Sequence, residues 1–198
     1  MRNKNVFILV MCAIGVALNI VLGTVVQMTK IPLLFLDTIG TIFVAVLFGP
    51  WQGAAVGTIT NLLTPILSGN VKDIPFFIVN AVVGIIIGFI AKKYKFDLKT
   101  AIISGLLLSI ISPLIGTPIA VWVYGGITGS GNDIIFLWLT KTGSSVFSAA
   151  FIPRITGNFI DKIASCILIF LSLKYIPEQY KNFDSEIKDE KNNSILKA

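Results

Sequence analysis

Apolar segments of roughly the length that crosses a bilayer recur along most of the chain. They lie at about residues 6–28, 34–50, 51–67, 74–91, 100–124 and 153–176. Hydrophobic residues make up 55% of the chain and charged residues only 13%, which is far more apolar than a soluble domain of this length could bury. Because about 20 residues of helix cross the hydrocarbon core, we expect an all-α membrane protein. Its six transmembrane helices would form one domain over residues 1–176, the second helix being short for a perpendicular crossing.

Basic residues indicate which ends of these helices face the cytoplasm. Arg2 and Lys4 precede the first segment, and a lysine cluster lies between residues 92 and 99. Since lysine and arginine concentrate in cytoplasmic loops, we expect the N-terminus and this loop to be cytoplasmic. An even number of crossings also places the charged tail, residues 177–198, inside. The net charge of +6 therefore reflects topology and does not indicate a nucleic-acid partner.

The region between the fifth and sixth segments is expected to lie outside the cell. Residues 125–133 are rich in glycine but lack the lysine and hydroxyl ending of a phosphate-binding loop, so a flexible outer loop is the better interpretation. Residues 134–151 are apolar in parts and interrupted at 141–145. We expect them to form an extracellular lid helix, on the outer face or partly re-entrant, that joins the sixth span at Pro153.

Several chemistries find little support in the residues present. The chain has no histidine, and both cysteines, Cys12 and Cys166, lie inside apolar segments. We therefore expect no disulfide framework, no metal site and no cofactor. No carboxylates are paired at catalytic spacing and no activated nucleophile can be recognised, so we do not expect an enzyme.

One face of the sixth segment carries an unusual number of polar side chains. Arg154, Asn158, Asp161 and Lys162 follow one another at helical spacing, so they share one face. Ionisable groups in a span are costly unless they face a protein interior or a wet cavity, and the stripe therefore predicts one wall of a binding site. For Asp161 and Lys162, pairing with neighbouring helices is an equally good explanation.

Polar and aromatic residues of other segments lie at a similar depth, in the half of the membrane expected to face outwards. This convergence predicts a pocket open to the outside for a small, partly aromatic, hydrogen-bonding molecule. For single residues simpler roles compete: helix capping for Asp37, contacts between helices for the asparagines and snorkelling for Arg154. The candidate substrate-binding residues are Asp37, Asn61, Asn80, Trp122, Tyr124, Asp133, Arg154, Asn158 and Asp161.

Four stretches resemble the substrate-binding S components of energy-coupling factor (ECF) vitamin transporters, in particular the riboflavin-type or a related branch. They are the Ala13-x-x-x-Ala17 pair, LDTIGTIFVAVLFGPWQGAAVG at 36–57, FFIVNAVVGIIIGFIAKK at 76–93 and NFIDKIASCILIFLSLKYIP at 158–177. With the six expected spans and both ends inside, the resemblance covers nearly the whole hydrophobic portion of the chain.

The resemblance implies a multi-pass plasma-membrane subunit of an ABC-type importer that binds a vitamin or a related heterocyclic micronutrient. Its partners would be a transmembrane coupling subunit, contacted by Ala13 and Ala17, and two cytoplasmic ATPases. The residues do not assign the vitamin. A membrane-embedded sensory module is the alternative, which the short tail after residue 176 disfavours because it leaves no room for an output domain.

Overall fold

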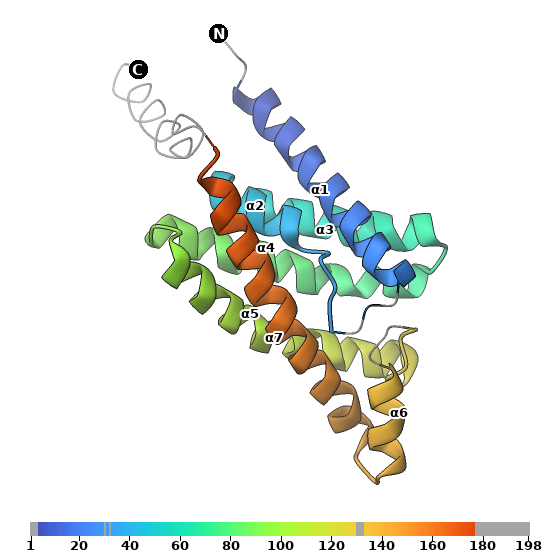
Figure 1. The fold of residues 1–198 in the computed structure, drawn as a ribbon. Helices are drawn as coiled ribbons and strands as arrows, with labels where there is room; N and C mark the ends of the chain where they lie inside the picture. The colour runs from blue at the N-terminus through green and yellow to red at the C-terminus, as the bar shows by residue number, and fades with distance from the viewer. Residues whose placement is uncertain (1–3, 30, 32, 130–132, 177–198) are drawn as a thin grey trace, which may run out of the picture.

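The computed structural model describes residues 4–29, 31, 33–129 and 133–176. Within these ranges it contains seven α-helices, one 3-10 helix and no strand. The predicted all-α architecture is therefore confirmed there, and Figure 1 shows how the helices are arranged. The elements are α1 (Lys4–Thr29), α2 (Ile39–Phe48), α3 (Pro50–Ser68), η1 (Val71–Phe76), α4 (Phe77–Lys93), α5 (Leu98–Tyr124), α6 (Asp133–Lys141) and α7 (Val146–Leu173). The predicted tail, 177–198, and residues 130–132 of the outer loop lie outside the described residues.

Four stretches of the described chain are long and apolar enough to cross a membrane: α1, η1 with α4, α5 and α7. The second predicted span differs from expectation, because α2 has ten residues and extends only about 15 Å at about 1.5 Å per residue. That is about half of a hydrocarbon core. α3 has the length of a span but carries polar residues on several turns, Asn61 among them.

A non-helical segment, residues 33–38, leads into α2 and is called the strap below. Leu33 and Leu36 in it have positive φ values of 64° and 52°, a conformation uncommon for residues with a side chain. The strap passes close to α7, where a Cβ on Gly157 would lie 3.2 Å from Leu33 Cα. An apolar sequence that resembles the start of a helix is therefore non-helical, because it packs against a distant helix.

The last helix begins earlier than predicted. α7 begins at Val146 rather than at Pro153, and Ser145 caps it by accepting a hydrogen bond from the Ser148 amide at 3.2 Å. A proline inside a helix removes one backbone donor, and α7 continues through it. Residues 134–151 therefore do not form one lid helix: they comprise most of α6, a turn at Gly143 (φ 92°) and the first turns of α7.

Glycines allow the central helices to approach one another closely. A Cβ on Gly40 of α2 would overlap the backbone of Gly15 in α1, and one on Gly57 of α3 would overlap the backbone of Asn80 in α4. Gly53 meets Gly84 in the same way, so α3 and α4 touch through their backbones at these glycines.

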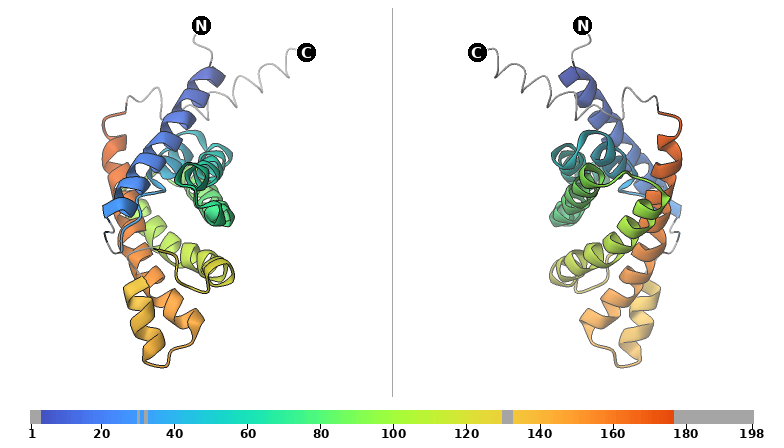
Figure 2. Two further views of the ribbon diagram at one scale, coloured as in Figure 1. Left: turned by 90° about the vertical axis from the view of Figure 1, so that its right-hand side faces the viewer. Right: turned by 90° about the vertical axis from the view of Figure 1, so that its left-hand side faces the viewer.

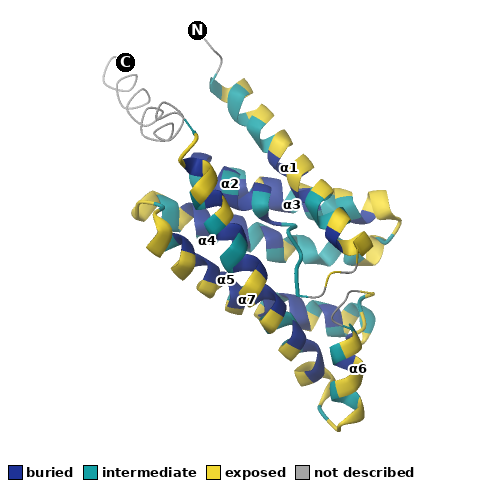
Figure 3. Ribbon diagram, viewed as in Figure 1, coloured by how far each residue is buried: buried dark blue, intermediate teal, exposed yellow. Residues whose placement is uncertain are grey.

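Burial is unevenly distributed between the helices. Figure 3 shows α2, α4 and the inner faces of α5 and α7 as the buried part, whereas α1 is exposed along most of its length. In Figures 1 and 2 the start of α1 and the end of α7 lie at one end of the molecule, and α6 lies toward the other. The apolar residues on the outer faces of the helices suit contact with lipid.

Candidate functional site

A cavity of about 290 Å³ lies between the strap and the helices around it. Its volume is at the lower end of the range for small-molecule sites, about 300–1,000 Å³. No residue of α6 borders it, although Thr128 of the preceding loop does. Its walls come from α1, the strap, α3, η1, α4, α5 and α7. The candidates Asp37, Asn61, Asn80, Arg154 and Asn158 all line it.

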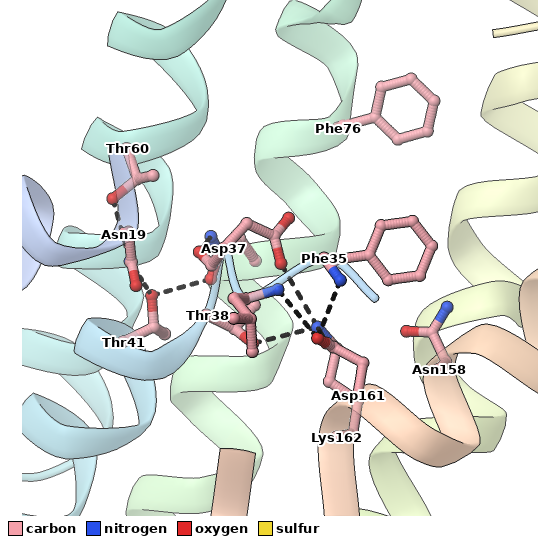
Figure 4. Close-up of polar contacts among 12 residues, drawn as sticks. Asn19, Phe35, Asp37, Thr38, Thr41, Thr60, Phe76, Asn158, Asp161 and Lys162 are labelled. Atoms are coloured by element: carbon pink, nitrogen blue, oxygen red, sulfur yellow. Dashed lines mark hydrogen bonds and ion pairs between the residues drawn. The ribbon is translucent and has the colours of Figure 1, made fainter. Parts of the chain in front are cut away.

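Lys162 lines the base of the cavity and Asp161 lies behind it, and both side chains are buried. Asp161 Oδ2 accepts a hydrogen bond from Lys162 Nζ at 2.7 Å, and its Oδ1 accepts from the amides of Phe35 and Leu36 at 2.9 and 2.8 Å. Figure 4 shows these bonds converging from α7 and the strap. The carboxylate thus accepts hydrogen bonds from strap amides that no helix or sheet would satisfy. The pairing that we expected for Asp161 is therefore made with the strap and with Lys162.

Lys162 also connects to the start of α2. Its Nζ donates to Thr38 Oγ1 at 3.0 Å and lies 3.4 Å from Asp37 Oδ1. Thr38, not Asp37, occupies the N-cap position, and its side chain makes no capping hydrogen bond. The Asp37 side chain keeps 41% of its surface exposed and lines the cavity. Of the two roles open for Asp37, the geometry therefore favours the pocket.

A second group of polar side chains joins four helices. Asn19 Nδ2 donates to Thr41 Oγ1 at 2.9 Å and to Thr60 Oγ1 at 3.1 Å, and its Oδ1 accepts from the Gly40 amide at 2.7 Å. Thr41 Oγ1 in turn donates to Asn80 Oδ1 at 2.8 Å. Asn19, Thr41 and Thr60 were not among the predicted site residues. A lone asparagine within a membrane span is the one signal that could have identified Asn19.

Asn80 and Asn61 extend this network to the cavity wall. Asn80 Nδ2 donates to Asn61 Oδ1 at 2.9 Å and to Asp37 O at 3.1 Å, and Asn61 Nδ2 donates to Phe76 O at 3.1 Å. Both hydrogens of the Asn80 amide are thus occupied within the protein. Asn80 therefore fixes the strap and Asn61 in place, as the helix-contact alternative anticipated.

Arg154 and Asn158 form the α7 wall of the cavity. Arg154 Nη1 donates to Ala150 O at 2.9 Å, and Nη2 lies 3.4 Å from Thr128 Oγ1. Asn158 Nδ2 donates to Arg154 O at 2.9 Å. A guanidinium has five N–H groups and an amide can make four hydrogen bonds, so both side chains keep capacity that they can direct at a ligand.

Four candidates do not line the cavity: Asp161, which lies behind Lys162, and three residues farther away. Trp122 is 82% exposed on the outside of α5. Tyr124 lies at the rim, where its hydroxyl donates to Asp73 Oδ1 at 2.9 Å and accepts from Asn70 Nδ2 at 2.8 Å. Asp133 accepts from the amides of Thr128 and Gly129 at 3.1 and 2.6 Å and so orders the outer loop.

Two aromatic side chains absent from the prediction face the cavity. Phe35 of the strap and Phe76 of η1 both line it, and Figure 4 shows their rings on the same side as Asn158. Lys162 Nζ lies 5.9 Å from the centroid of the Phe35 ring. Aromatic faces beside amide and charged groups suit a planar heteroaromatic ligand. Phenylalanines are common throughout this chain, so nothing in the sequence distinguishes these two.

The two alanines of α1 lie away from the cavity. Ala13 and Ala17 are exposed on the helix surface, within a face that also exposes Val10, Ile14 and Val21. Among the described residues no group of histidine, cysteine, aspartate or glutamate side chains could hold a metal ion.

Comparison with known families gives one match that spans most of the chain. The model of the family described as "ECF-type riboflavin transporter, S component" matches residues 3–176. No curated protein and no solved structure matches the chain.

Proposed function

We propose that this chain, which belongs to the family of ECF-type riboflavin transporter S components, binds riboflavin in the cavity between the strap, α4, α5 and α7. Family membership makes it a multi-pass plasma-membrane subunit that binds a substrate for transport and is not an enzyme. The proposal adds the identity of the vitamin and the place where it binds.

One observation supports this assignment most directly: the same cavity combines aromatic rings with side chains that have hydrogen-bonding capacity left for a ligand. Phe35 and Phe76 supply flat apolar surface, and Asn158, Arg154 and Asp37 supply donors and acceptors. Riboflavin has the matching chemistry, because it joins a planar heteroaromatic ring system to a polyol chain. Stacking and hydrogen bonding of that ring system would orient it in the site.

The chain would cross the membrane six times, with the strap and α2 together forming the second crossing. The non-helical strap precedes α2 directly and adds to its length of about 15 Å. Non-helical backbone at membrane depth must be satisfied by protein groups. The bonds from Phe35 and Leu36 to Asp161, and from Asn80 to the Asp37 carbonyl, meet that requirement.

Both ends of the chain and the lysine-rich loop would be cytoplasmic. Support comes from contacts between the ends of helices: the rings of Phe7 in α1 and Phe48 in α2 lie 6.0 Å apart, and a Cβ on Gly49 would lie 2.7 Å from Lys92 Cε at the end of α4. The end of α7 lies toward the same end of the molecule as the start of α1 (Figure 1). These parts therefore lie at one end of the molecule, which positive residues would orient inwards. The cavity would lie toward the other end, where Thr128 of the loop after α5 forms part of its lining.

Transport would require partners. The chain would deliver its ligand with a transmembrane coupling subunit and two cytoplasmic ATPases, as the family's description as an ECF transporter suggests. The exposed face of α1 around Ala13 and Ala17 is the proposed contact with the coupling subunit, because small residues four apart permit close approach of another helix.

Identification of small molecules that co-purify with the protein tests the proposed ligand. Detergent-solubilised protein, purified without added vitamin, would be denatured and its extract analysed by absorption and mass spectrometry. We expect riboflavin in the extract, and none in an extract from an unrelated membrane protein purified from the same cells. Recovery of a different heterocycle would contradict the riboflavin assignment while leaving the family unchanged.

A further inference from the structure

Four buried hydroxyl groups make no hydrogen bond to any described residue. They lie on α5 and α7, the two helices that pack against each other beside the cavity. They belong to Ser104, Ser112 and Thr117 of α5 and Ser165 of α7. A buried hydroxyl without a partner is destabilising, because it has lost its hydrogen bonds to water. Small hydroxyl residues also serve helix packing in membranes, so burial alone assigns no role to any of them.

Ser112 differs from the other three because it borders the cavity. It lines the cavity together with Pro113 and Gly116 of the same helix, whereas Ser104, Thr117 and Ser165 do not line it. The residue is only 4% exposed. Ser112 is therefore an unsatisfied polar residue at the edge of the site. Its Oγ is almost wholly enclosed in the present side-chain orientation, and rotation about χ1 to another staggered rotamer would turn it toward a ligand.

Ser112 and Asn158 lie at nearly the same depth on facing helices. α5 and α7 run in opposite directions (Figure 1), and a Cβ on Gly105 would overlap Ile163, which fixes their register. Ser112 lies seven residues after Gly105 and Asn158 five residues before Ile163, so their levels differ by about 3 Å at about 1.5 Å per residue.

The Asn158 amide is also incompletely used. One Nδ2 hydrogen is donated to Arg154 O, which leaves one hydrogen and the Oδ1 acceptor for a ligand. The facing surfaces of α5 and α7 thus offer a donor and an acceptor from the Asn158 amide and a third polar group from the Ser112 hydroxyl. The neighbouring surface of Pro113 and Gly116 is apolar and has no long side chain.

We propose that the Ser112 hydroxyl is a ligand-contacting group that hydrogen-bonds, beside the Asn158 amide, the polar edge of the flavin ring system. This inference rests on the proposed function and adds a specificity-determining residue to it. The ring edge carries alternating carbonyl and N–H groups, which match an amide and a hydroxyl held side by side. The polyol chain would then lie toward the outer end, near Arg154 and Thr128.

Fluorescence-quenching titrations of ligand-free protein with riboflavin and with lumiflavin test this inference. Lumiflavin keeps the ring system and replaces the polyol chain by a methyl group. For Ser112→Ala we expect the Kd to rise about 3- to 10-fold for both ligands, the loss of one hydrogen bond. Ser104→Ala is the matched control, because it removes an equally buried, unpartnered hydroxyl from the same helix away from the cavity. Its Kd should equal that of the parent protein.

The melting temperature distinguishes a contact from a folding defect. Without ligand, Ser112→Ala should melt no lower than the parent protein, because the substitution removes an unsatisfied group. An unchanged Kd for Ser112→Ala, or equal losses in Ser112→Ala and Ser104→Ala, would overturn the inference. So would a loss confined to riboflavin, because the contact would then be with the chain. A parent protein that binds neither flavin would overturn the proposed function, and this inference with it.

Discussion

Asp161 and Lys162 are adjacent in the chain and form a buried ion pair, with Lys162 Nζ 2.7 Å from Asp161 Oδ2. The other carboxylate oxygen binds the strap amides, so the pair fastens the strap to α7. These two residues therefore hold the floor of the cavity, while Asp37 and Asn158 present polar atoms to its interior.

Asp161→Asn should destabilise the protein by about 3 kcal/mol or more. The amide would place its own N–H groups toward the Lys162 ammonium, and a buried charge that loses its partner typically costs about 3–5 kcal/mol. The melting temperature in detergent would measure the effect. Asp97→Asn is the control: Asp97 is exposed and caps α5 by accepting from the Thr100 amide at 2.8 Å, and asparagine caps equally well. An Asp161→Asn variant as stable as this control would contradict the structural role.

Gly40→Ala should lower the melting temperature strongly, because the added methyl would overlap the backbone of Gly15 and overpacking costs about 1–3 kcal/mol. Gly116→Ala should leave stability unchanged or raise it. Its Cβ would lie 3.6 Å from Val79 Cγ2, an ordinary contact, and alanine favours a helix over glycine by about 1 kcal/mol. Equal effects of the two substitutions would show that α1 and α2 do not pack as described.

Asn158→Ala should weaken riboflavin binding about 10-fold, since it removes hydrogen bonds worth about 1.5 kcal/mol. Arg154→Ala should also weaken binding, because it removes the charged donors beside Thr128. Trp122→Ala is the control, and its Kd should match that of the parent, because its side chain is exposed away from the cavity. Unchanged affinity in Asn158→Ala would return that residue to a purely structural role.

Ala13→Leu and Ala17→Leu should abolish transport in the assembled complex and leave riboflavin affinity unchanged. A leucine on this face would hold a partner helix away, while the cavity lies elsewhere in the molecule. Uptake of labelled riboflavin into cells that express the complete complex would measure the effect. Ala55→Leu, at an exposed alanine of α3, should transport normally. Normal uptake by both α1 variants would refute the proposed contact.

Much of the helical framework follows from local sequence. Long apolar runs bounded by lysines, glycines and prolines locate α1, α4 and α5 to within a few residues, because each is stabilised largely by its own backbone bonds and by lipid. The polar face of α7 could be predicted for the same reason: helical spacing places Arg154, Asn158, Asp161 and Lys162 together.

Features that depend on distant contacts could not be predicted. The strap has the composition of a helix start, but its backbone is fixed by Asp161, which lies 125 residues away from Leu36 in sequence. α7 extends back to Val146 because Ser145 caps it, although the polar turn and Pro153 suggested a later start. Trp122 and Tyr124 lie at similar depth, but residues two apart on a helix point in different directions, and depth alone did not reveal which faced the cavity.

Equilibrium binding of riboflavin to the ligand-free, purified protein tests the central claim most directly. Quenching of flavin fluorescence should saturate at one riboflavin per chain, and Asn158→Ala should shift the curve to higher concentration without changing its end point. A parent protein that shows no saturable binding, or Asn158→Ala and Arg154→Ala variants that both bind riboflavin as tightly as the parent, would contradict the account of this cavity as the riboflavin site.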